Sequence, residues 1–387
     1  MKRRSNRIKG EETYFDFALL LIVLLLLAFG LVMVFSTSSH SAAIEMGDST
    51  YYFYKQLRMN LIGIFAMMLI TMMPYRWIKL IPLWFCYAVG LALIFALLSS
   101  YGVTRNGATR WLKILGIQFQ VADLVKLLVI FILAKYLELN VNKLTNWKEV
   151  AKFVGIMIPF PILIYYISEN LSSAIIIVAI GFVMLFIVTK NYKWFVLITI
   201  AGVGFIGGYV LWIKNTASGV DSFRNARILA WLDPEGFEGI QAEQPLQSLY
   251  AIGSGGLFGK GLGQSMQKIK SLSESQNDMI FSIICEELGL FPALGIILLY
   301  IILIWRIMII AMNARDLYGM LLVVGIMAHT AIQTLINIAV ATNSIPNTGV
   351  SLPFISYGGT FAIIILSEMG IVMSVARGIK LKSSSMS

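Results

Sequence analysis

Long apolar stretches alternate with short polar segments along most of the chain. A helix needs about 20 apolar residues to cross the hydrocarbon core of a membrane, and ten stretches reach or approach that length. They cover residues 15–36, 57–74, 77–99, 121–139, 150–167, 172–189, 193–213, 283–310, 318–342 and 354–376. The pattern predicts an all-α polytopic membrane protein with about ten transmembrane helices. The first stretch is too long for a secretory signal peptide and lacks a small-residue cleavage site.

The composition supports this prediction. Of the 387 residues, 58% are hydrophobic and 13% are charged, whereas a soluble domain usually carries roughly 25% charged residues. Such a chain has too few charges to cover a water-facing surface. We therefore expect one membrane domain over residues 1–387, with residues 1–14 and 377–387 as terminal tails.

The distribution of Lys and Arg predicts the orientation. Basic residues concentrate in both tails and in alternate loops, whereas the short loops between hold few, namely Lys55, Arg58, Arg105, Arg110 and Lys113. Cytoplasmic loops carry the excess of positive charge, so both termini are expected in the cytoplasm. The net charge of +10 is then a topology signal that favours anionic membrane lipids, and no nucleic acid is expected as a partner.

The segment 214–282 is a long polar loop on the external side. It carries a glycine run from Gly253 to Gly263, which resembles an anion-binding nest, although close packing also produces glycine-rich loops. Aromatic residues such as Phe223 and Trp231 predict an ordered loop on the membrane surface. The polar loop after stretch 77–99 leaves open a short re-entrant segment.

Ionisable residues inside a membrane span are costly and are functional hypotheses by default. Asp123 and Lys126 lie three positions apart and share a helix face, either as an ion pair between packed helices or with Lys126 facing a phosphate group. Asp278 stands where the long loop meets the next helix and could simply cap it. Glu286 and Glu287 follow two turns deeper, where hydrogen bonds that stabilise the helices are the plain alternative to a functional role.

A second polar group lies near the C-terminus. His329, Gln333 and Asn337 recur every four residues and form a stripe of the kind that joins membrane helices; a proton carrier at His329 is the minor alternative. Glu368 is expected to pair with a cation on the cytoplasmic side.

The depth of these polar groups favours an enzyme over a transporter. Most of them, Arg110, Lys126 and Asp278 among them, map to the external face or the outer half of the membrane. A solute transporter would more often place its polar site near the midplane. We therefore expect chemistry at the outer leaflet.

Few metal-binding side chains are present. Cys86 and Cys285 fall in apolar stretches, where buried inert thiols are the default, and His40 and His329 are the two histidines. No zinc site is predicted.

Three motifs resemble the SEDS family (shape, elongation, division and sporulation), which includes FtsW, RodA and SpoVE. They are Asn106-Gly-Ala-Thr-Arg110-Trp111 leading to Phe119-Gln120-Val-Ala-Asp123-Leu-Val-Lys126; Gln247 to Gly261 continuing to Asn277-Asp278-Met-Ile-Phe281 and Glu286-Glu287-Leu-Gly289; and Asn337-Ile-Ala-Val with Pro346-Asn-Thr-Gly349 and Leu352-Pro-Phe-Ile-Ser356-Tyr357-Gly-Gly359. The resemblance spans almost the whole chain, and the details around Lys268 and Asn277 are closer to FtsW and SpoVE than to RodA.

The chain departs from the family pattern at two places. The family's Pro-Ser-Glu reads Val121-Ala122-Asp123, and its Leu-Pro-Glu reads Leu272-Ser273-Glu274. Asp keeps the charge of Glu with a shorter reach, so the partners of Lys126 need not be those that the family pattern implies.

The resemblance implies a peptidoglycan glycosyltransferase at the outer face of the bacterial cytoplasmic membrane. Its substrate would be lipid II, the undecaprenyl-pyrophosphate-linked disaccharide peptide, which it would polymerise into β-1,4-linked glycan with inversion, in cell division or sporulation. A class B penicillin-binding protein, a transpeptidase, would be its partner. A lipid II flippase and a non-catalytic scaffold for that partner remain the alternatives.

The resemblance also implies roles for single residues. Asp278 matches the family's catalytic aspartate and would be the general base. Arg110 and Lys126 are candidates for pyrophosphate contact by charge and depth, followed by Lys260, Lys268 and Lys270. The supporting residues would be Asp123, Glu286, Glu287, Gln333, Asn337, Ser356 and Tyr357. A divalent cation, Mg²⁺ or Mn²⁺, could share the diphosphate charge, but no carboxylate cluster predicts a dedicated metal site.

Overall fold

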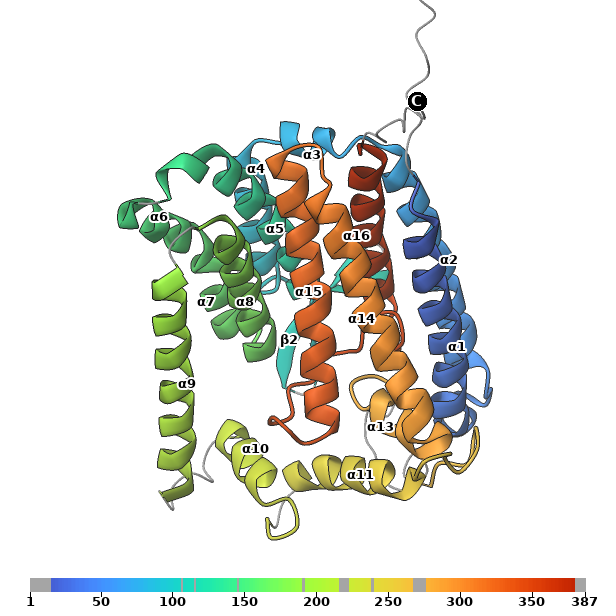
Figure 1. The fold of residues 1–387 in the computed structure, drawn as a ribbon. Coiled ribbons are helices and arrows are strands. Elements are labelled where there is room, and N and C mark those ends of the chain that lie inside the picture. Colours follow the sequence, from blue (N-terminus) through green and yellow to red (C-terminus); the bar gives the residue numbers. More distant parts are fainter. Residues whose placement is uncertain are drawn as a thin grey trace, which may run out of the picture.

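The computed structural model describes residues 15–105, 107–114, 116–144, 146–189, 192–215, 223–237, 240–266 and 276–379. Its long helices lie side by side as a bundle (Figure 1). They are α1 (Phe17–Met46), α2 (Tyr51–Met72), α4 (Leu83–Ala96), α5 (Val121–Asn140), α8 (Leu171–Val188), α9 (Tyr192–Asn215), α14 (Leu290–Met312), α15 (Leu317–Ala341) and α16 (Thr360–Arg377). Shorter elements are α3 (Arg76–Leu80), η1 (Val141–Lys143), α6 (Trp147–Met157), α7 (Pro159–Ile167), α10 (Phe223–Leu232), α11 (Ile240–Gly255) and α13 (Ile280–Leu288).

Six of the described helical segments are long and apolar enough to cross a membrane. They are Phe17–Met46, Trp147–Ile167, Leu171–Val188, Leu290–Met312, Leu317–Ala341 and Thr360–Arg377. The other four predicted stretches are helical as well, as α2, α4, α5 and α9. The protein is therefore a multi-pass membrane protein, as predicted.

Helix limits differ from the prediction where the backbone cannot continue a helix. The predicted helix 77–99 breaks at Pro82, which becomes the N-cap of α4, and the helix 150–167 is divided next to Pro159, since proline has no N–H to donate. Gly289, at φ 86°, separates α13 from α14 within the predicted helix 283–310. Three predicted helices are thus helix pairs.

The last predicted helix starts later than expected. α16 begins at Thr360, whereas the prediction began at residue 354. Phe354 and Gly359 both have positive φ, a conformation that does not fit a right-handed helix. The residues before α16 are therefore a loop, and that loop reaches the candidate site.

α15 lies at the centre of the bundle and packs against α5, α8, α14 and α16. α16 also packs closely along α2, where a Cβ at Gly370 would lie only 2.7 Å from the carbonyl oxygen of Met67. Small residues let membrane helices approach to this distance. The two helices nearest the C-terminus of the described chain therefore form the interior of the molecule.

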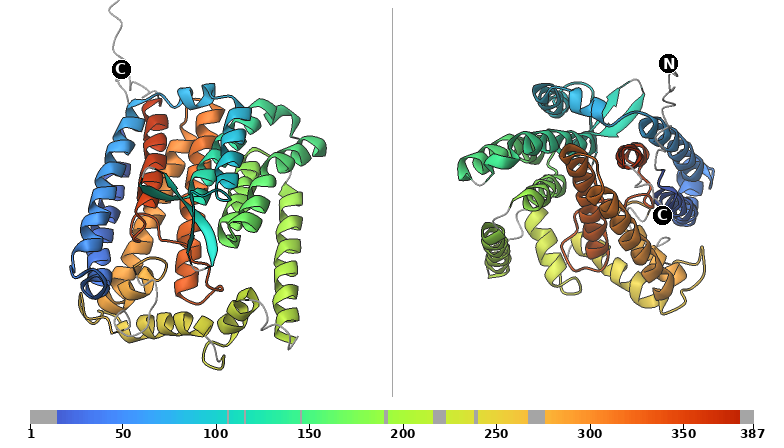
Figure 2. Two further views of the ribbon diagram at one scale, coloured as in Figure 1. Left: turned by 180° about the vertical axis from the view of Figure 1, so that it is seen from behind. Right: turned by 45° about the horizontal axis from the view of Figure 1, so that its top comes forward.

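A small antiparallel sheet occupies the loop after α4, where a re-entrant segment was left open. Its strands are β1 (Gly102–Arg105), β2 (Ala108–Ile114) and β3 (Ile117–Gln120), in the order β1-β2-β3. β2 pairs with both neighbours, and the sheet lies on one side of the bundle against α5 and α16 (Figure 2). This hairpin arrangement places Arg110 on the central strand.

The two ends of the bundle differ. α10 and α11 lie across one end (Figure 1), which we call the loop end. α1 begins and α16 ends at the opposite end, which we call the tail end, where Arg306 pairs with Asp16 at 2.9 Å and Lys79 pairs with Glu138. The expectation of an ordered loop is confirmed for α10 and α11. The start of α1 and the end of α16 lie at the same end, and the cytoplasmic location of that end stays a prediction.

Candidate active site

Asp278 lies at the loop end in the short segment before α13, and its residue is 8% exposed. α13 begins at Ile280 with Met279 as its N-cap, and the cap has no side-chain hydrogen bond. Met279, and not Asp278, therefore occupies the N-cap position of α13. An acidic side chain this deeply buried in a membrane protein needs another explanation.

The backbone around Asp278 is held by α15 and by the loop before α16. The Nδ2 of Asn337 donates to the carbonyl oxygen of Asp278 at 2.8 Å and to that of Val350 at 2.7 Å. Ser356 Oγ donates to the carbonyl oxygen of Asn277. These hydrogen bonds, which we call the backbone clamp, fix the position of Asp278 through its main chain.

Tyr357 adds a further contact to the same segment. Its backbone N donates to the carbonyl oxygen of Gln276 at 2.9 Å. The Tyr357 ring packs edge-on against Tyr52 at 5.2 Å between centroids, and Lys55 Nζ lies 5.9 Å from its centre. The residue thus joins the segment before α13 to α2.

Residues 343–350 form a loop over the carboxylate of Asp278. A Cβ at Gly349, which has φ 66°, would lie 3.7 Å from Asp278 Oδ2. Ser172 Oγ of α8 donates to the carbonyl of Thr348 at 2.8 Å, and Arg227 Nη1 of α10 donates to that of Asn347 at 3.2 Å. Two separate elements therefore hold this loop beside the carboxylate.

Two guanidinium groups lie in the same region. Arg110 donates from Nε to the carbonyl of Ser168 at 3.1 Å and from Nη2 to that of Glu169 at 2.9 Å, in the turn before α8. Burial lowers the pKa of Arg227, while the charge of Asp278 raises it and the charge of Arg110 lowers it further. Arg227 is therefore close enough to both residues for their charges to act on it.

Lys126 and Asp123 form the predicted ion pair. Lys126 Nζ lies 2.7 Å from Asp123 Oδ1, and the Lys126 residue is 2% exposed. Nζ also donates to Gln333 Oε1 on α15 at 3.2 Å. The pair joins α5 to α15, which confirms the packing interpretation, and a phosphate contact of Lys126 stays a prediction.

The polar stripe on α15 joins helices as predicted. His329 Nε2 lies 2.9 Å from Gln333 Oε1, and Gln333 Nε2 donates to the carbonyl of Ser351 at 3.2 Å. Glu368 pairs with His329 Nδ1 at 2.9 Å, so the expectation of a cytoplasmic-side cation is wrong. The helix directions place Glu368 opposite the middle of α15, away from the tail end.

Glu286 and Glu287 fold the glycine run onto α13. Glu286 is fully buried and accepts from Lys260 Nζ at 2.9 Å and from the backbone N of Met266 at 3.2 Å, with Ser265 Oγ as a third donor. Its charge is thus satisfied by this loop. The structure places Lys260 with Glu286, and a pyrophosphate contact of Lys260 stays a prediction.

Glu287 connects the same loop to α1. It accepts from Ser36 Oγ, which itself accepts from the backbone N of Gly263 at 3.2 Å. A Cβ at Gly255 would lie 2.0 Å from the carbonyl oxygen of Cys285, and one at Gly259 would lie 2.2 Å from that of Glu287. Close packing therefore explains these glycines.

Three further expectations concern two lysines of the long loop, the two cysteines and a metal site. Lys268 and Lys270 lie outside the described residues. Cys86 and Cys285 are buried free thiols, as expected. Within the described ranges, no three His, Cys, Asp or Glu side chains form a group able to hold a metal ion.

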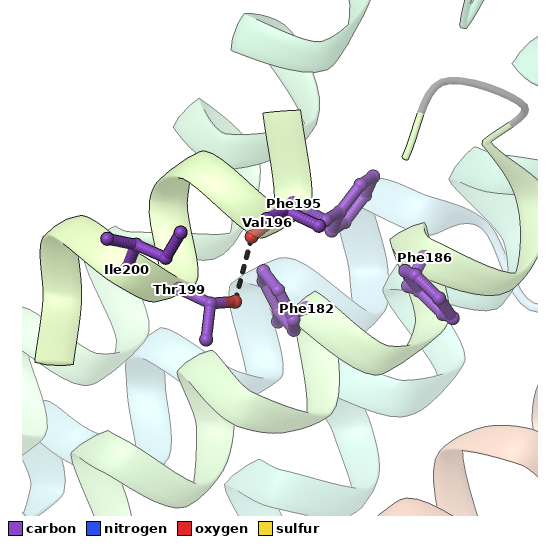
Figure 3. A pocket seen from close by; sticks show the side chains of 6 residues that line it. All are labelled: Phe182, Phe186, Phe195, Val196, Thr199 and Ile200. Atoms are coloured by element: carbon purple, nitrogen blue, oxygen red, sulfur yellow. Dashed lines mark hydrogen bonds between the residues drawn. The ribbon is translucent and has the colours of Figure 1, made fainter. Parts of the chain in front are cut away.

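A crevice of about 240 Å³ between α8 and α9 is separate from these groups. It is lined by Phe182, Phe186, Phe195, Val196, Thr199 and Ile200 (Figure 3). Its hydroxyl, Thr199 Oγ1, donates to the carbonyl of Phe195 in the same helix at 2.8 Å. An apolar crevice of this kind offers no group for the chemistry expected at Asp278.

Sequence analysis missed the contribution of α10. Arg227 and Trp231 lie one helical turn apart, and Trp231 Nε1 donates to the carbonyl of Asn343 at 2.9 Å. The spacing of four residues, one cation and one aromatic, was the available signal. The charge rule does not point to Arg227, because long loops cross the membrane largely regardless of their charge.

Comparison with known proteins identifies relatives over nearly the full chain. A family model described as "Cell cycle protein", covering FtsW, RodA and SpoVE, matches residues 17–381. Stage V sporulation protein E of Bacillus subtilis (strain 168) is 37% identical over 372 residues, which are 95% of this chain and 98% of that protein. The probable peptidoglycan glycosyltransferase FtsW of Trichlorobacter lovleyi is 34% identical over 374 residues, 95% and 94% of the two chains.

Solved structures share the fold. A chain of a peptidoglycan synthase complex, described as coordinating polymerization and crosslinking, matches with a TM-score of 0.74 at 24% identity, covering 94% of this chain and 98% of that one. The rod shape determining protein RodA of Thermus thermophilus matches with a TM-score of 0.67 at 23% identity, covering 95% and 98%. The full-length family match and the two relatives above 30% identity show that this chain belongs to the FtsW, RodA and SpoVE family.

Proposed function

We propose that this protein is a peptidoglycan glycosyltransferase that polymerises lipid II into β-1,4-linked glycan. Its family membership supports this, since a relative at 34% identity is named a probable peptidoglycan glycosyltransferase. The observation that carries the proposal is the site itself. A buried Asp278 is held through its backbone at the loop end, and the charges of Arg110 and Arg227 act in the same region.

In the proposed reaction, Asp278 is the general base. Its carboxylate accepts the proton of the 4-hydroxyl of one GlcNAc as that oxygen attacks the anomeric carbon of MurNAc on a lipid-linked chain. The bond from that carbon to the pyrophosphate breaks, and undecaprenyl pyrophosphate leaves with the electron pair. Attack opposite the leaving group converts the α-linked donor into a β-linked product.

The leaving pyrophosphate requires positive charge, which preorganised cations supply well in a site that excludes water. We assign this role first to Arg110 and Lys126, and Lys260, Lys268 and Lys270 remain further candidates. Ser356, Tyr357 and Asn337 hold the backbone of the base, Gln333 and Asp123 hold Lys126, and Glu286 and Glu287 hold the glycine run. A divalent cation, Mg²⁺ or Mn²⁺, would share the diphosphate charge if bound, but the described carboxylates form no group for it and no step above uses one.

The proposed setting is the bacterial cytoplasmic membrane, in one membrane domain. The loop end, with segment 214–282, faces outward, and the tail end with both termini faces the cytoplasm. A class B penicillin-binding protein is the proposed partner, because a structural relative is part of a peptidoglycan synthase complex that coordinates polymerization and crosslinking. Cell division or sporulation is the proposed context, because the matching family model is described as "Cell cycle protein" and one relative is named a stage V sporulation protein.

Substitution of the base tests the proposal. We expect Asp278→Asn to lower the rate of glycan polymerisation by about 10²- to 10⁴-fold, the usual contribution of a general base, without changing the thermal unfolding midpoint. The assay combines purified protein, its candidate class B partner and lipid II, and measures the length and amount of glycan. Asp48→Asn is the matched control, because Asp48 is an exposed aspartate bonded to Thr50 at the same end.

Two results would contradict the proposal. If Asp278→Asn polymerises at the wild-type rate, Asp278 is structural and the mechanism is wrong. If neither protein makes glycan in the presence of the partner, the scaffold or flippase alternative replaces the polymerase.

A further inference from the structure

His329 and Glu368 form a fully buried pair to which the mechanism above gives no role. His329 Nδ1 lies 2.9 Å and 3.0 Å from the two carboxyl oxygens of Glu368, and neither residue is exposed. Both belong to the middle of long helices, α15 and α16. Ionisable groups at this depth are costly and are functional hypotheses by default, so the contacts of this pair indicate what role it has.

The contacts of Gln333 fix the orientation of its amide. Lys126 Nζ and His329 Nε2 both approach the atom Oε1, at 3.2 Å and 2.9 Å. An ammonium group can only donate, so the shared atom must be the oxygen, and His329 Nε2 must carry a hydrogen. The other amide atom, Nε2, then donates to the carbonyl of Ser351, which can only accept.

The proton count of the pair follows from this. Because Nε2 of His329 carries a hydrogen, the contact between Nδ1 and Glu368 contains one further proton, on the ring or on the carboxyl group. In either form the pair is neutral as a whole. Lys126 in turn contacts Asp123, so each ionisable side chain of the network has a partner of the opposite type, which limits the cost of burying it.

The network reaches the candidate site at two points. At the first point, Gln333 accepts a hydrogen bond from the ammonium group of Lys126. At the second, Gln333 donates to the carbonyl of Ser351. The neighbouring residue, Val350, is linked by the Asn337 amide to the backbone of Asp278. Gln333, which contacts Lys126, and Asn337, which contacts the backbone of Asp278, are thus one turn apart on α15. The orientation of a single amide decides whether both contacts exist together.

We propose that His329 and Glu368 are positioning residues of the active site, which hold the Gln333 amide so that it supports Lys126 and the loop at Ser351 together. This inference rests on the proposed function and extends it to two residues that touch no substrate. Without the hydrogen bond from His329, the Gln333 side chain loses one of the three contacts that define its rotamer. Lys126 then keeps Asp123 as its partner but is no longer held toward α15.

Two substitutions of Glu368 separate positioning from proton transfer. The amide introduced by Glu368→Gln can donate to Nδ1 of a neutral imidazole, which still donates from Nε2 to Gln333. We expect Glu368→Gln to polymerise lipid II within about threefold of wild type, and Glu368→Ala and His329→Ala to lose at least tenfold. Ser367→Ala is the matched control on α16, because Ser367 Oγ bonds only within its own helix, to Ile363, among the contacts described.

A second measurement does not depend on catalysis. Thermal unfolding midpoints of wild type, Glu368→Ala, Lys126→Met and the double variant, all in detergent, form a double-mutant cycle. We expect the double variant to be more stable than the sum of the two single effects predicts, because both break one network. Additive effects would overturn the inference.

The outcomes distinguish the two proposals. If Glu368→Gln is as inactive as Glu368→Ala, a titrating carboxyl group is required and positioning is wrong. If Glu368→Ala is fully active, the pair has no role in the site. If wild type itself makes no glycan with its partner, the proposed function fails, while the double-mutant cycle still decides whether the pair is coupled to Lys126.

Discussion

Asp278 and Glu286 lie eight positions apart at the same end of the protein, and both are buried, but they are held in different ways. Glu286 is held through its carboxylate oxygens, by Lys260, Ser265 and the backbone of Met266. Asp278 is held through its peptide carbonyl, by Asn337. The difference is that the contacts described for Glu286 involve its carboxylate, whereas the hydrogen bond described for Asp278 involves its main chain.

A general base gains and loses a proton in every catalytic cycle. Protonation of Glu286 would weaken its pair with Lys260 and loosen the glycine run. Protonation of Asp278 leaves the hydrogen bonds of the backbone clamp unchanged, since they involve main-chain carbonyls. The comparison therefore separates a carboxylate that supports the fold from the proposed catalytic one, and three substitutions test it.

The largest effect is expected at Glu286. Glu286→Ala leaves Lys260, Ser265 and the backbone N of Met266 without their buried acceptor. A hydrogen bond to a charged group is worth about 1.5–3 kcal/mol, so the free energy of unfolding in detergent should fall by roughly 4 kcal/mol or more. Chemical denaturation followed by circular dichroism measures the change. Glu235→Ala, at an exposed position after α10, should stay within about 0.5 kcal/mol. A stable Glu286→Ala protein without activity would instead place Glu286 among the catalytic groups.

A smaller effect is expected at Asn337. Asn337→Ala removes both hydrogen bonds of its amide, worth about 1–3 kcal/mol together, and lets the backbone of Asp278 move. If that energy is lost in the transition state, kcat falls roughly 5- to 150-fold with KM for lipid II unchanged. Steady-state polymerisation kinetics measure both constants. Thr334→Ala, which removes a hydroxyl bonded within α15, serves as the control, and a rise in KM alone would argue against the clamp.

The smallest effect is expected at Lys260. The side chain is 33% exposed and contacts Glu286 and Ser254, and without it Glu286 keeps Ser265 and the backbone of Met266 as donors. Lys260→Met should therefore cost about 1 kcal/mol of stability, after allowance for solvent screening. KM for lipid II should stay within about threefold of wild type. A tenfold rise in KM at unchanged stability would show that Lys260 binds the pyrophosphate, as the sequence alone suggested.

The helices and the ion pair of Lys126 could be predicted from the sequence because they depend on local spacing. Apolar length identified the membrane helices, and a separation of three residues brought Asp123 and Lys126 together. The breaks at Pro82 and Gly289 were missed because apolar residues continue across them, and hydropathy does not record backbone conformation.

The contacts between distant segments could not be predicted in the same way. The motif matches pointed to Asp278 and Asn337, but nothing local indicates that one donates to the backbone of the other. A cytoplasmic cation was expected for Glu368 because a charge pattern indicates depth in the membrane but does not identify a contact partner. Its actual partner, His329, comes from another helix. Arg227 was missed for the same reason, since its role depends on a loop 120 positions later.

The backbone clamp also sets when the protein can become active during its synthesis. Asn337 is made 59 positions after Asp278, which takes about 3 to 12 s at a synthesis rate of roughly 5–20 residues per second. Ser356 follows later still, next to the last described helix. Asp278 is therefore synthesised before the residues that hold its backbone, and a nascent chain has no assembled candidate site until α15 and α16 have been inserted.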